Sequence, residues 1–436
     1  MPSAAPLSGR TLTRNVWITA TGYLLPMLAA FATAPILARQ LGVEDRGHLA
    51  AATAPFLLVS GALTLGVPES LTYAVARGTA RPRALLGRAL VILLLAGAIA
   101  AGILVLGAGA LSAGSEPVRR IIVLSAAATV PALFVGALRG AASGLHRWTR
   151  VTVERSISAG VRLVGIVGLA LLGQLSVSTA AVVLVAAPVL GGAAYLGLGR
   201  LLEAEAVPEA PRTPLLGYGL RVWVGALSGL LLLRLDQTII APLSSATELG
   251  YYALAVTIAE VPLLLTAAAR NVMFAADSSE PDAARLATTA RLVTALCLLA
   301  ALGMAALLPW AIPVVFGPEF GPALPVTLVL LLAMVLGNPG SFAGSGLSSR
   351  GRPGLRSTSL VIACLVNIAL LVWLVPVLGA MGAAWATLVG NVVAAGLNLV
   401  WLRHFFGVPM REFHGLRRAD VAAARRLLSR SSKEAA

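Results

Sequence analysis

The chain alternates between long apolar runs and short polar interruptions. A helix needs about 20 apolar residues to cross a bilayer core of about 30 Å, whereas the strands of a membrane barrel show alternating segments of about ten residues. The continuous runs therefore predict an all-α integral membrane protein. We expect twelve transmembrane helices, at residues 15–38, 48–76, 84–111, 121–145, 151–173, 177–202, 215–240, 250–275, 287–315, 322–347, 355–378 and 380–402.

The longest polar interruption inside the chain divides the predicted helices six and six. This division predicts an N-terminal six-helix bundle at 1–202, a cytoplasmic linker at 203–214, a C-terminal six-helix bundle at 215–402 and a basic cytoplasmic tail at 403–436. Because six crossings return the chain to its starting side, we expect the two bundles to be parallel repeats. Repeats of this kind recur in secondary transporters, whose binding site lies between them.

A weak sequence echo favours the repeat. Residues 44–47 lie between the first two predicted helices, and residues 247–250 lead from the connection after the seventh into the start of the eighth. Gly47 aligns with Gly250, and each has an acidic residue two positions before it. Unrelated hydrophobic hairpins also look alike, so this echo alone leaves the repeat open.

The composition supports a protein whose main solvent is lipid. Apolar residues make up 58% of the chain and charged residues 12%, against about 45–50% and about 25% in soluble domains. The net charge is +15, but the basic residues lie in bursts between apolar runs rather than in one aromatic-interleaved patch. We therefore expect membrane lipid, and no nucleic acid, as a partner.

The loop arginines predict an orientation. If the N-terminus is cytoplasmic, the opposite loops hold only Arg39, Arg46, Arg119 and Arg120, and the remaining loop and tail arginines face the cytoplasm. Cytoplasmic loops of membrane proteins carry an excess of arginine and lysine. We expect both termini in the cytoplasm and no large domain on the other side, because the opposite loops are short.

Ionisable side chains inside the predicted helices are the candidates for a substrate cavity or a coupling site, since such groups are costly in lipid. These candidates are Glu260, Arg270, Glu69, Asp236, Arg234 and Arg139.

Among these candidates, Glu260 is short and close to mid-depth, so it cannot reach the membrane surface. Arg270 lies about two and a half turns further along the same predicted helix and can offer a guanidinium group to a phosphate. Arg234 and Asp236 are two residues apart, so on a helix they point to different sides and do not pair. Arg139 can also reach the inner surface by extending its side chain, a simpler interpretation.

No pattern in the sequence indicates catalysis or a cofactor. The two cysteines lie singly in apolar runs, the four histidines are scattered, and no zinc-site spacing or phosphate-binding loop occurs. We expect no enzyme, no catalytic residue, no cofactor and no metal ligand.

Several segments resemble the polysaccharide-export flippases, which move lipid-linked oligosaccharides and belong to the multidrug/oligosaccharidyl-lipid/polysaccharide (MOP) superfamily. The resemblance covers residues 10–402, and its motifs are ARQLGVEDRG at 38–47, LGVPES at 65–70, GALRGAASGLH at 136–146, and RLD at 234–236 followed by LGYYALA at 249–255.

This resemblance implies a MATE-like fold with two six-helix bundles around a central, often cationic cavity. It implies a bacterial cytoplasmic membrane and alternating-access transport of an undecaprenyl-pyrophosphate-linked oligosaccharide to the outer leaflet. Polysaccharide polymerase and glycosyltransferases are the protein partners that it suggests. The lipid II flippases of the superfamily commonly have fourteen helices, whereas this chain has twelve predicted ones.

Three other functions stay open at this point. A cation-coupled drug exporter of the same superfamily could use Glu260 and Asp236 as coupling carboxylates. An enzyme acting on lipid-linked glycan is disfavoured by the short loops and the missing catalytic residues. A scaffold could recruit partners through its basic tail, whose segment 416–428 could also lie on anionic lipid.

Overall fold

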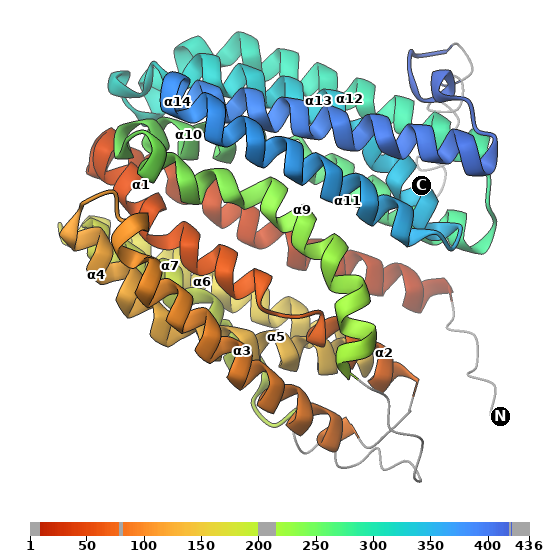
Figure 1. Ribbon diagram of the computed structural model, residues 1–436, viewed down its shortest axis with the longest axis horizontal. Coiled ribbons are helices and arrows are strands. Elements are labelled where there is room, and N and C mark those ends of the chain that lie inside the picture. Colours follow the sequence, from red (N-terminus) through yellow and green to blue (C-terminus); the bar gives the residue numbers. More distant parts are fainter. Residues whose placement is uncertain (1–8, 78–81, 199–214, 418–419, 421–436) are drawn as a thin grey trace, which may run out of the picture. The chain divides into compact units, whose positions relative to one another are not determined.

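The computed structural model describes residues 9–77, 82–198, 215–417 and 420. These residues form helices joined by short turns, and no strand occurs among them (Figure 1). The chain divides into two compact units, which we call the N-terminal unit (residues 1–230 and 237–253) and the C-terminal unit (231–236 and 254–436).

The predicted linker at 203–214 lies outside the described residues. The bundles expected at 1–202 and 215–402 therefore stay a prediction.

The N-terminal unit is built mainly from the first eleven elements. They are α1 (Gly9–Ala62), α2 (Val67–Ala76), α3 (Pro82–Leu111), α4 (Glu116–Ser125), η1 (Ala126–Ala128), α5 (Thr129–Gly144), α6 (Trp148–Leu171), α7 (Val177–Gly191), η2 (Gly192–Tyr195), and parts of α9 (Leu215–Leu243) and α10 (Ala246–Ala259).

Helix α1 is too long to be a single membrane crossing. Its 54 residues would span roughly 80 Å as a straight helix, against a hydrocarbon core of about 30 Å. Gly42 breaks it with a φ of 74° and a ψ of −176°, and a positive φ is readily adopted only by glycine. The break separates the runs predicted to start at residues 15 and 48.

A second break divides the next predicted helix, at residues 48–76. Helix α1 ends at Ala62 and α2 begins at Val67, with positive φ angles at Leu65 and Gly66 between them. The indole N–H of Trp223 donates a hydrogen bond to the Ala62 carbonyl at 2.5 Å. This contact satisfies a backbone acceptor that the break exposes, as membrane interiors require.

Small residues let helices of the N-terminal unit approach closely. A Cβ atom at Gly140 on α5 would lie 2.4 Å from the Pro68 carbonyl oxygen on α2. Beside this contact, the Thr72 hydroxyl donates to the Gly140 carbonyl at 2.9 Å. Close backbone contact through glycine and a hydroxyl hydrogen bond is typical of helix packing in membranes.

The C-terminal unit contains most of the remaining elements. They are α11 (Leu263–Ser279), α12 (Ala283–Ala311), a π-helical turn η3 (Ile312–Phe316), η4 (Pro318–Phe320), α13 (Ala323–Ser349), α14 (Pro353–Phe406) and η5 (Met410–Phe413).

Helix α14 repeats the design of α1. It also has 54 residues, and Gly379 breaks it with a φ of 55° and a ψ of −131°. Its second half lies against α13, where a Cβ atom at Gly340 would overlap the backbone of Ala395. Glycine at this position therefore sets the spacing between the two helices.

The start of the tail packs onto the C-terminal unit. The Arg291 guanidinium on α12 binds the Asp420 carboxylate through Nε–Oδ2 and Nη2–Oδ1 contacts of 2.7 and 2.5 Å. Phe413 is buried in the apolar cluster that contains Leu286 and Phe342. The hydrogen bonds from Arg291 outweigh burial and lower the pKa of Asp420. This part of the predicted tail is thus an ordered cap, whereas residues 421–436 lie outside the described residues.

The apolar helices establish the class of protein. Seven helices in the described part are long and apolar enough to cross a membrane, or eight when the bent pair α4–α5 is one span. The prediction of an all-α, multi-pass membrane protein is confirmed. The count of twelve crossings and the two-repeat layout stay predictions.

Candidate functional site

Glu260 forms an ion pair with Arg234 in the C-terminal unit. The Arg234 Nη2 atom lies 3.2 Å from Glu260 Oε1, and both side chains are partly exposed. Glu260 does not lie within a continuous helix, because α10 ends at Ala259 and α11 begins at Leu263. The helix predicted at 250–275 is therefore broken at the candidate carboxylate. Two of the six predicted candidates thus meet each other.

Asp236 belongs to a different cluster of oxygen and amide groups. It is 4% exposed, and the Thr387 hydroxyl donates to its Oδ2 atom at 3.5 Å. Asn367 is buried nearby, since a Cβ atom at Gly390 would lie 3.2 Å from the Asn367 Cβ. Gly390 is one helical turn beyond Thr387 on α14. The carboxylate, hydroxyl and amide offer oxygen ligands of the type that hard cations prefer.

The Asn367 amide strengthens this interpretation. Its Nδ2 atom is buried and has no hydrogen-bond partner among the residues that the structure describes. An amide can present either its oxygen or its nitrogen to a site, because the two assignments differ by a flip. No group of three or more acidic, histidine or cysteine side chains suited to a metal occurs in the described ranges.

Arg270 lies against α13 together with a second arginine, Arg356 from α14. The Arg270 Nη1 atom donates to the Ser341 hydroxyl at 2.8 Å. A Cβ atom at Gly344 would lie 3.3 Å from Arg356 Cγ. Ser341 and Gly344 are three residues apart and share one helix face. The two half-buried arginines therefore lie along the same side of α13, close enough for their charges to repel each other.

No carboxylate among the residues that the structure describes compensates this arginine pair. Neither Arg270 nor Arg356 makes an ion pair within the described part of the chain. Asn398 lies beside them, with its Nδ2 atom 2.7 Å from a Cβ at Gly344, and its buried Oδ1 atom has no hydrogen-bond partner among the described residues. Two adjacent guanidinium groups without a counter-charge are suited to bind an anion with two charged centres.

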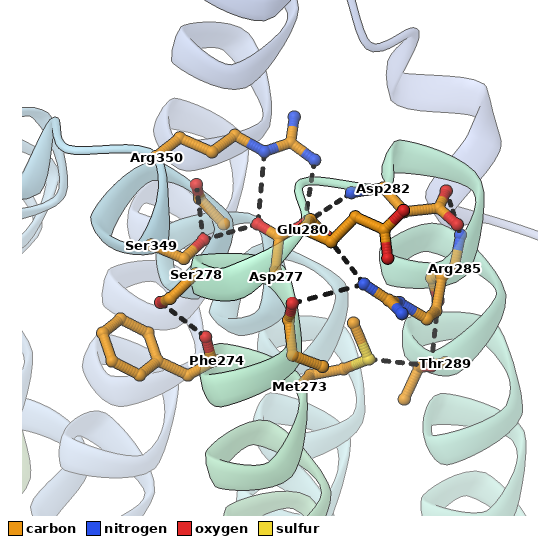
Figure 2. A network of polar contacts seen from close by, with 12 residues as sticks. Met273, Phe274, Asp277, Ser278, Glu280, Asp282, Arg285, Thr289, Ser349 and Arg350 are labelled. Carbon is orange, nitrogen blue, oxygen red and sulfur yellow. Dashed lines mark hydrogen bonds and ion pairs between the residues drawn. The ribbon is translucent and has the colours of Figure 1, made fainter. Parts of the chain in front are cut away.

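The carboxylate nearest to Arg270 along α11 is engaged elsewhere. Asp277 is fully buried and accepts hydrogen bonds from the Ser349 hydroxyl at 2.5 Å and from Arg350 Nε and Nη2 at 3.2 Å. Figure 2 shows Ser349 and Arg350 pointing at Asp277 from the end of α13. Burial on its own raises the pKa of Asp277, but these hydrogen bonds outweigh it and lower the pKa.

The turn after α11 completes this network (Figure 2). The Asp282 backbone N–H donates to Asp277 Oδ1 at 3.1 Å, and Arg285 donates to the Glu280 carbonyl at 2.7 Å. The ends of α11 and α13 and the start of α12 are therefore tied together. Asp277 is bound to Arg350 and makes no ion pair with Arg270 or Arg356.

In the N-terminal unit, Arg139 has a very different environment. Its Nε and Nη2 atoms each donate to the Glu154 carboxylate at 2.8 Å, and the Tyr195 hydroxyl donates to Glu154 Oε2 at 3.1 Å. Glu154 is 2% exposed. The positive charge of Arg139 is thus compensated by a buried carboxylate that ties α5, α6 and η2 together.

Glu69 lies apart from these clusters. It is exposed in the first turn of α2 and makes no ion pair within the described residues. The structure therefore distributes the six predicted candidates over several places. Arg234 and Glu260 pair, Asp236 and Arg270 join separate polar clusters, and Arg139 and Glu69 lie in the N-terminal unit.

Sequence reasoning missed several partners of the candidates. Arg356 is the second residue of the helix predicted at 355–378, and Glu154 is the fourth residue of the helix predicted at 151–173, so neither stands out as a charge inside the membrane. Thr387 and Asn367 are uncharged, so a search for ionisable groups did not select them. Buried asparagines in apolar runs were the signal that could have pointed to Asn367 and Asn398.

The family model for polysaccharide biosynthesis proteins matches residues 12–274, more than half of the chain. The chain belongs to the polysaccharide biosynthesis protein family. The resemblance inferred from the four sequence motifs is thereby confirmed. No curated protein matches the chain at a significant level.

Solved structures identify the fold of this family member. An inward-facing multidrug-resistance MATE transporter of the MOP superfamily is 15% identical, with a TM-score of 0.70 over 91% of this chain and 100% of that one. The lipid II flippase MurJ is 13% identical, with a TM-score of 0.68 over 91% and 88%. A MOP-superfamily transporter from Pyrococcus furiosus is 16% identical, with a TM-score of 0.63 over 90% and 94%. The chain thus has the fold of MOP-superfamily transporters.

Proposed function

We propose that this protein is a flippase that moves an undecaprenyl-pyrophosphate-linked oligosaccharide from the cytoplasmic to the outer leaflet of a bacterial membrane. The observation that carries the proposal is the uncompensated pair of Arg270 and Arg356, in a chain of the polysaccharide biosynthesis family. A pyrophosphate offers two linked anionic centres, and arginine binds phosphate oxygens through paired N–H groups. An uncharged or cationic drug gives these two side chains no counter-charge.

The proposed mechanism is alternating access. The pyrophosphate binds the two guanidinium groups, which replace part of its hydration, while the polyprenyl chain stays in the bilayer. The glycan follows through the polar interior, because sugars are too costly to move through hydrocarbon. The same arginines must release the head group on the other side, so the affinity has to differ between the two states.

The proposed topology has twelve crossings with both termini in the cytoplasm. The breaks at Gly42 and Gly379 let α1 and α14 each supply two crossings. A reciprocal contact supports two parallel repeats. A Cβ at Gly47 would meet the Ala246 carbonyl, and a Cβ at Gly250 would meet the Val43 carbonyl. Val43 and Ala246 are separated in the sequence by the same number of residues as Gly47 and Gly250, so the two contacts join equivalent positions of the proposed repeats. Reciprocal contacts of this kind are typical of a two-fold axis.

We further propose that the cluster of Asp236, Thr387 and Asn367 couples transport to a cation or a proton. A buried carboxylate with hydroxyl and amide neighbours can bind either of them, and ionisable groups at membrane depth favour such roles. Arg234 and Glu260 pair at the break between α10 and α11, so bending of the chain at this break can separate the two side chains. Asp236, Arg234 and Glu260 therefore stay candidates for mutagenesis, as do Glu69 and Arg139.

Deletion of the gene tests the substrate class. The deletion strain should lack surface polysaccharide and accumulate undecaprenyl-linked precursor on the cytoplasmic side, and the wild-type chain should restore export. Normal surface glycan in the deletion strain would contradict the proposal. The expected partners are the glycosyltransferases that build the precursor and the polymerase that consumes it.

A cation-coupled multidrug exporter is the second candidate function. The buried carboxylate Asp236 favours it, because cation coupling needs a group of this kind. In that case the deletion strain should become more sensitive to cationic drugs while its surface glycan stays intact.

A further inference from the structure

Arg46, near the middle of α1, is a buried arginine without a counter-charge. It is 7% exposed, and its Nε atom has no hydrogen-bond partner among the residues that the structure describes. It makes no ion pair with any of them either. The neighbouring Asp45 contacts His48 instead, with 3.3 Å between Oδ1 and Nδ1. Arginine stays protonated in proteins, so the fold buries a charge that no carboxylate offsets, which is costly.

Arg46 lies where α1 meets α10 in the N-terminal unit. A Cβ atom at the next residue, Gly47, would overlap the Ala246 carbonyl, and a Cβ atom at Gly250 would overlap the Val43 carbonyl. The two backbones therefore touch, and glycine at both positions permits this approach. We call the meeting of these segments the outer contact, because both lie at the outer ends of their crossings in the proposed topology.

The equivalent position of the second proposed repeat is apolar. With the offset that aligns Gly47 with Gly250, Arg46 corresponds to Leu249, which is fully buried. One buried position of the outer contact thus holds a leucine, and the equivalent one holds an arginine. Packing at the outer contact therefore accepts an apolar side chain, and it does not by itself require a guanidinium group at residue 46.

We propose that Arg46 is a gating residue, whose buried charge favours opening of the outer contact. While the contact is closed, the guanidinium group has no counter-charge. When the contact opens, water reaches the group, so the open state gains hydration that the closed state lacks. This difference shifts the equilibrium toward opening, which alternating access requires. The proposal rests on the proposed function and topology, because a transporter must open this contact to release its substrate on the outer side.

Arg46→Leu tests the proposal, because it copies the residue of the second repeat. Loss of an unpaired buried charge should stabilise the closed contact, so the purified protein should unfold at a temperature about 2–4 °C above that of wild type. The same stabilisation should slow translocation of the undecaprenyl-pyrophosphate-linked oligosaccharide in reconstituted vesicles about fivefold, since opening becomes harder. Ordinary packing damage would lower both stability and translocation, so the opposite signs identify gating.

Arg120→Leu is the matched control. Arg120 belongs to another connection on the proposed outer side, is 74% exposed and pairs with Glu116 at 3.1 Å. Its loss should leave the unfolding temperature and the translocation rate unchanged, because exposed ion pairs contribute little. A lower unfolding temperature of Arg46→Leu, or translocation at the wild-type rate, would overturn the proposal.

Thiol labelling measures opening of the contact directly. Leu249→Cys places a thiol in the outer contact, in a chain whose two native cysteines, Cys297 and Cys364, are replaced by alanine. A water-soluble maleimide should label this thiol more slowly when Arg46→Leu is also present. Equal labelling rates with and without Arg46→Leu would overturn the proposal.

The gating role and the proposed function fail in different experiments. If Arg46→Leu translocates normally while Arg270→Gln does not, only the gating role is refuted. If the deletion strain exports glycan normally, the proposed function is refuted, whatever Arg46→Leu does to stability and labelling.

Discussion

Arg139 and Arg270 look alike in the sequence, since each is a single arginine within a predicted membrane helix. The structure places them in opposite electrostatic settings. Arg139 makes two charge-assisted hydrogen bonds to the buried Glu154 carboxylate. Arg270 has a hydroxyl, Ser341, as its partner and lies near a second arginine, Arg356.

A charge inside a membrane helix therefore indicates a ligand only where the protein does not compensate it. A guanidinium group paired with a carboxylate stabilises the helix packing around it, and removal of either partner leaves the other one buried and unpaired. Two uncompensated arginines cost folding free energy, and an anionic ligand can recover it. The compensated arginine should therefore affect stability, and the uncompensated pair should affect transport.

The largest expected effect is a loss of glycan export when the arginine pair is disrupted. Arg270→Gln should lower glycan export at least tenfold with little change in thermal stability, because no ion pair is lost. Arg352→Gln is the matched control, since Arg352 is exposed and stacks on the Phe405 ring. Complementation of a deletion strain, measured as surface glycan per amount of membrane protein, checks this prediction. Equal loss of export in Arg270→Gln and Arg352→Gln would contradict a special role of the arginine pair in transport.

The second effect is on the stability of the N-terminal unit. Arg139→Met leaves Glu154 without its cation, and loss of one partner of a buried pair costs about 3–5 kcal/mol. The Arg139 side chain is 39% exposed, so water reduces the cost and we expect the lower end of this range. Thermal unfolding of the purified protein measures it. The double variant with Glu154→Gln should recover part of the loss, whereas a single variant as stable as wild type would show that the pair is dispensable.

The third effect concerns pH. The lowered pKa of Asp277 means that its pair with Arg350 contributes stability above the unfolded-state pKa of about 4, and that this contribution is lost as pH falls through the folded-state pKa. Asp277→Asn should therefore be less stable than wild type by a constant amount between about pH 5 and 8. The stability curves of the wild type and Asp277→Asn should converge in stronger acid. Convergence at neutral pH instead would contradict a stabilising ion pair between Asp277 and Arg350.

The smallest effect is expected at the paired carboxylate. Glu260→Gln weakens the contact with Arg234 but keeps a hydrogen-bonding group, so export should fall a few-fold rather than vanish. Glu319→Gln changes an exposed carboxylate in η4 and serves as its control. Equal export by the two variants would remove Glu260 from the candidate residues.

The apolar pattern was sufficient to predict the helical membrane class, because the bilayer requires long apolar segments and internal hydrogen bonding. It did not predict the breaks at Leu65 and Gly66 or at Glu260, since short turns inside apolar runs leave hydropathy unchanged. It also could not assign partners across helices. Glu154 and Arg356 became visible as the partner and the neighbour of Arg139 and Arg270 only when tertiary packing brought distant segments together.

Transport in reconstituted vesicles tests the central claim most directly. The wild-type protein and the double variant Arg270→Gln/Arg356→Gln are compared for translocation of an undecaprenyl-pyrophosphate-linked oligosaccharide. The outer-leaflet product is measured by its accessibility to a glycan-modifying enzyme. If the arginine pair binds the pyrophosphate, the wild type should translocate the substrate rapidly, and the translocation rate of the double variant should be at least a hundredfold lower. Equal translocation rates for the two proteins would contradict it.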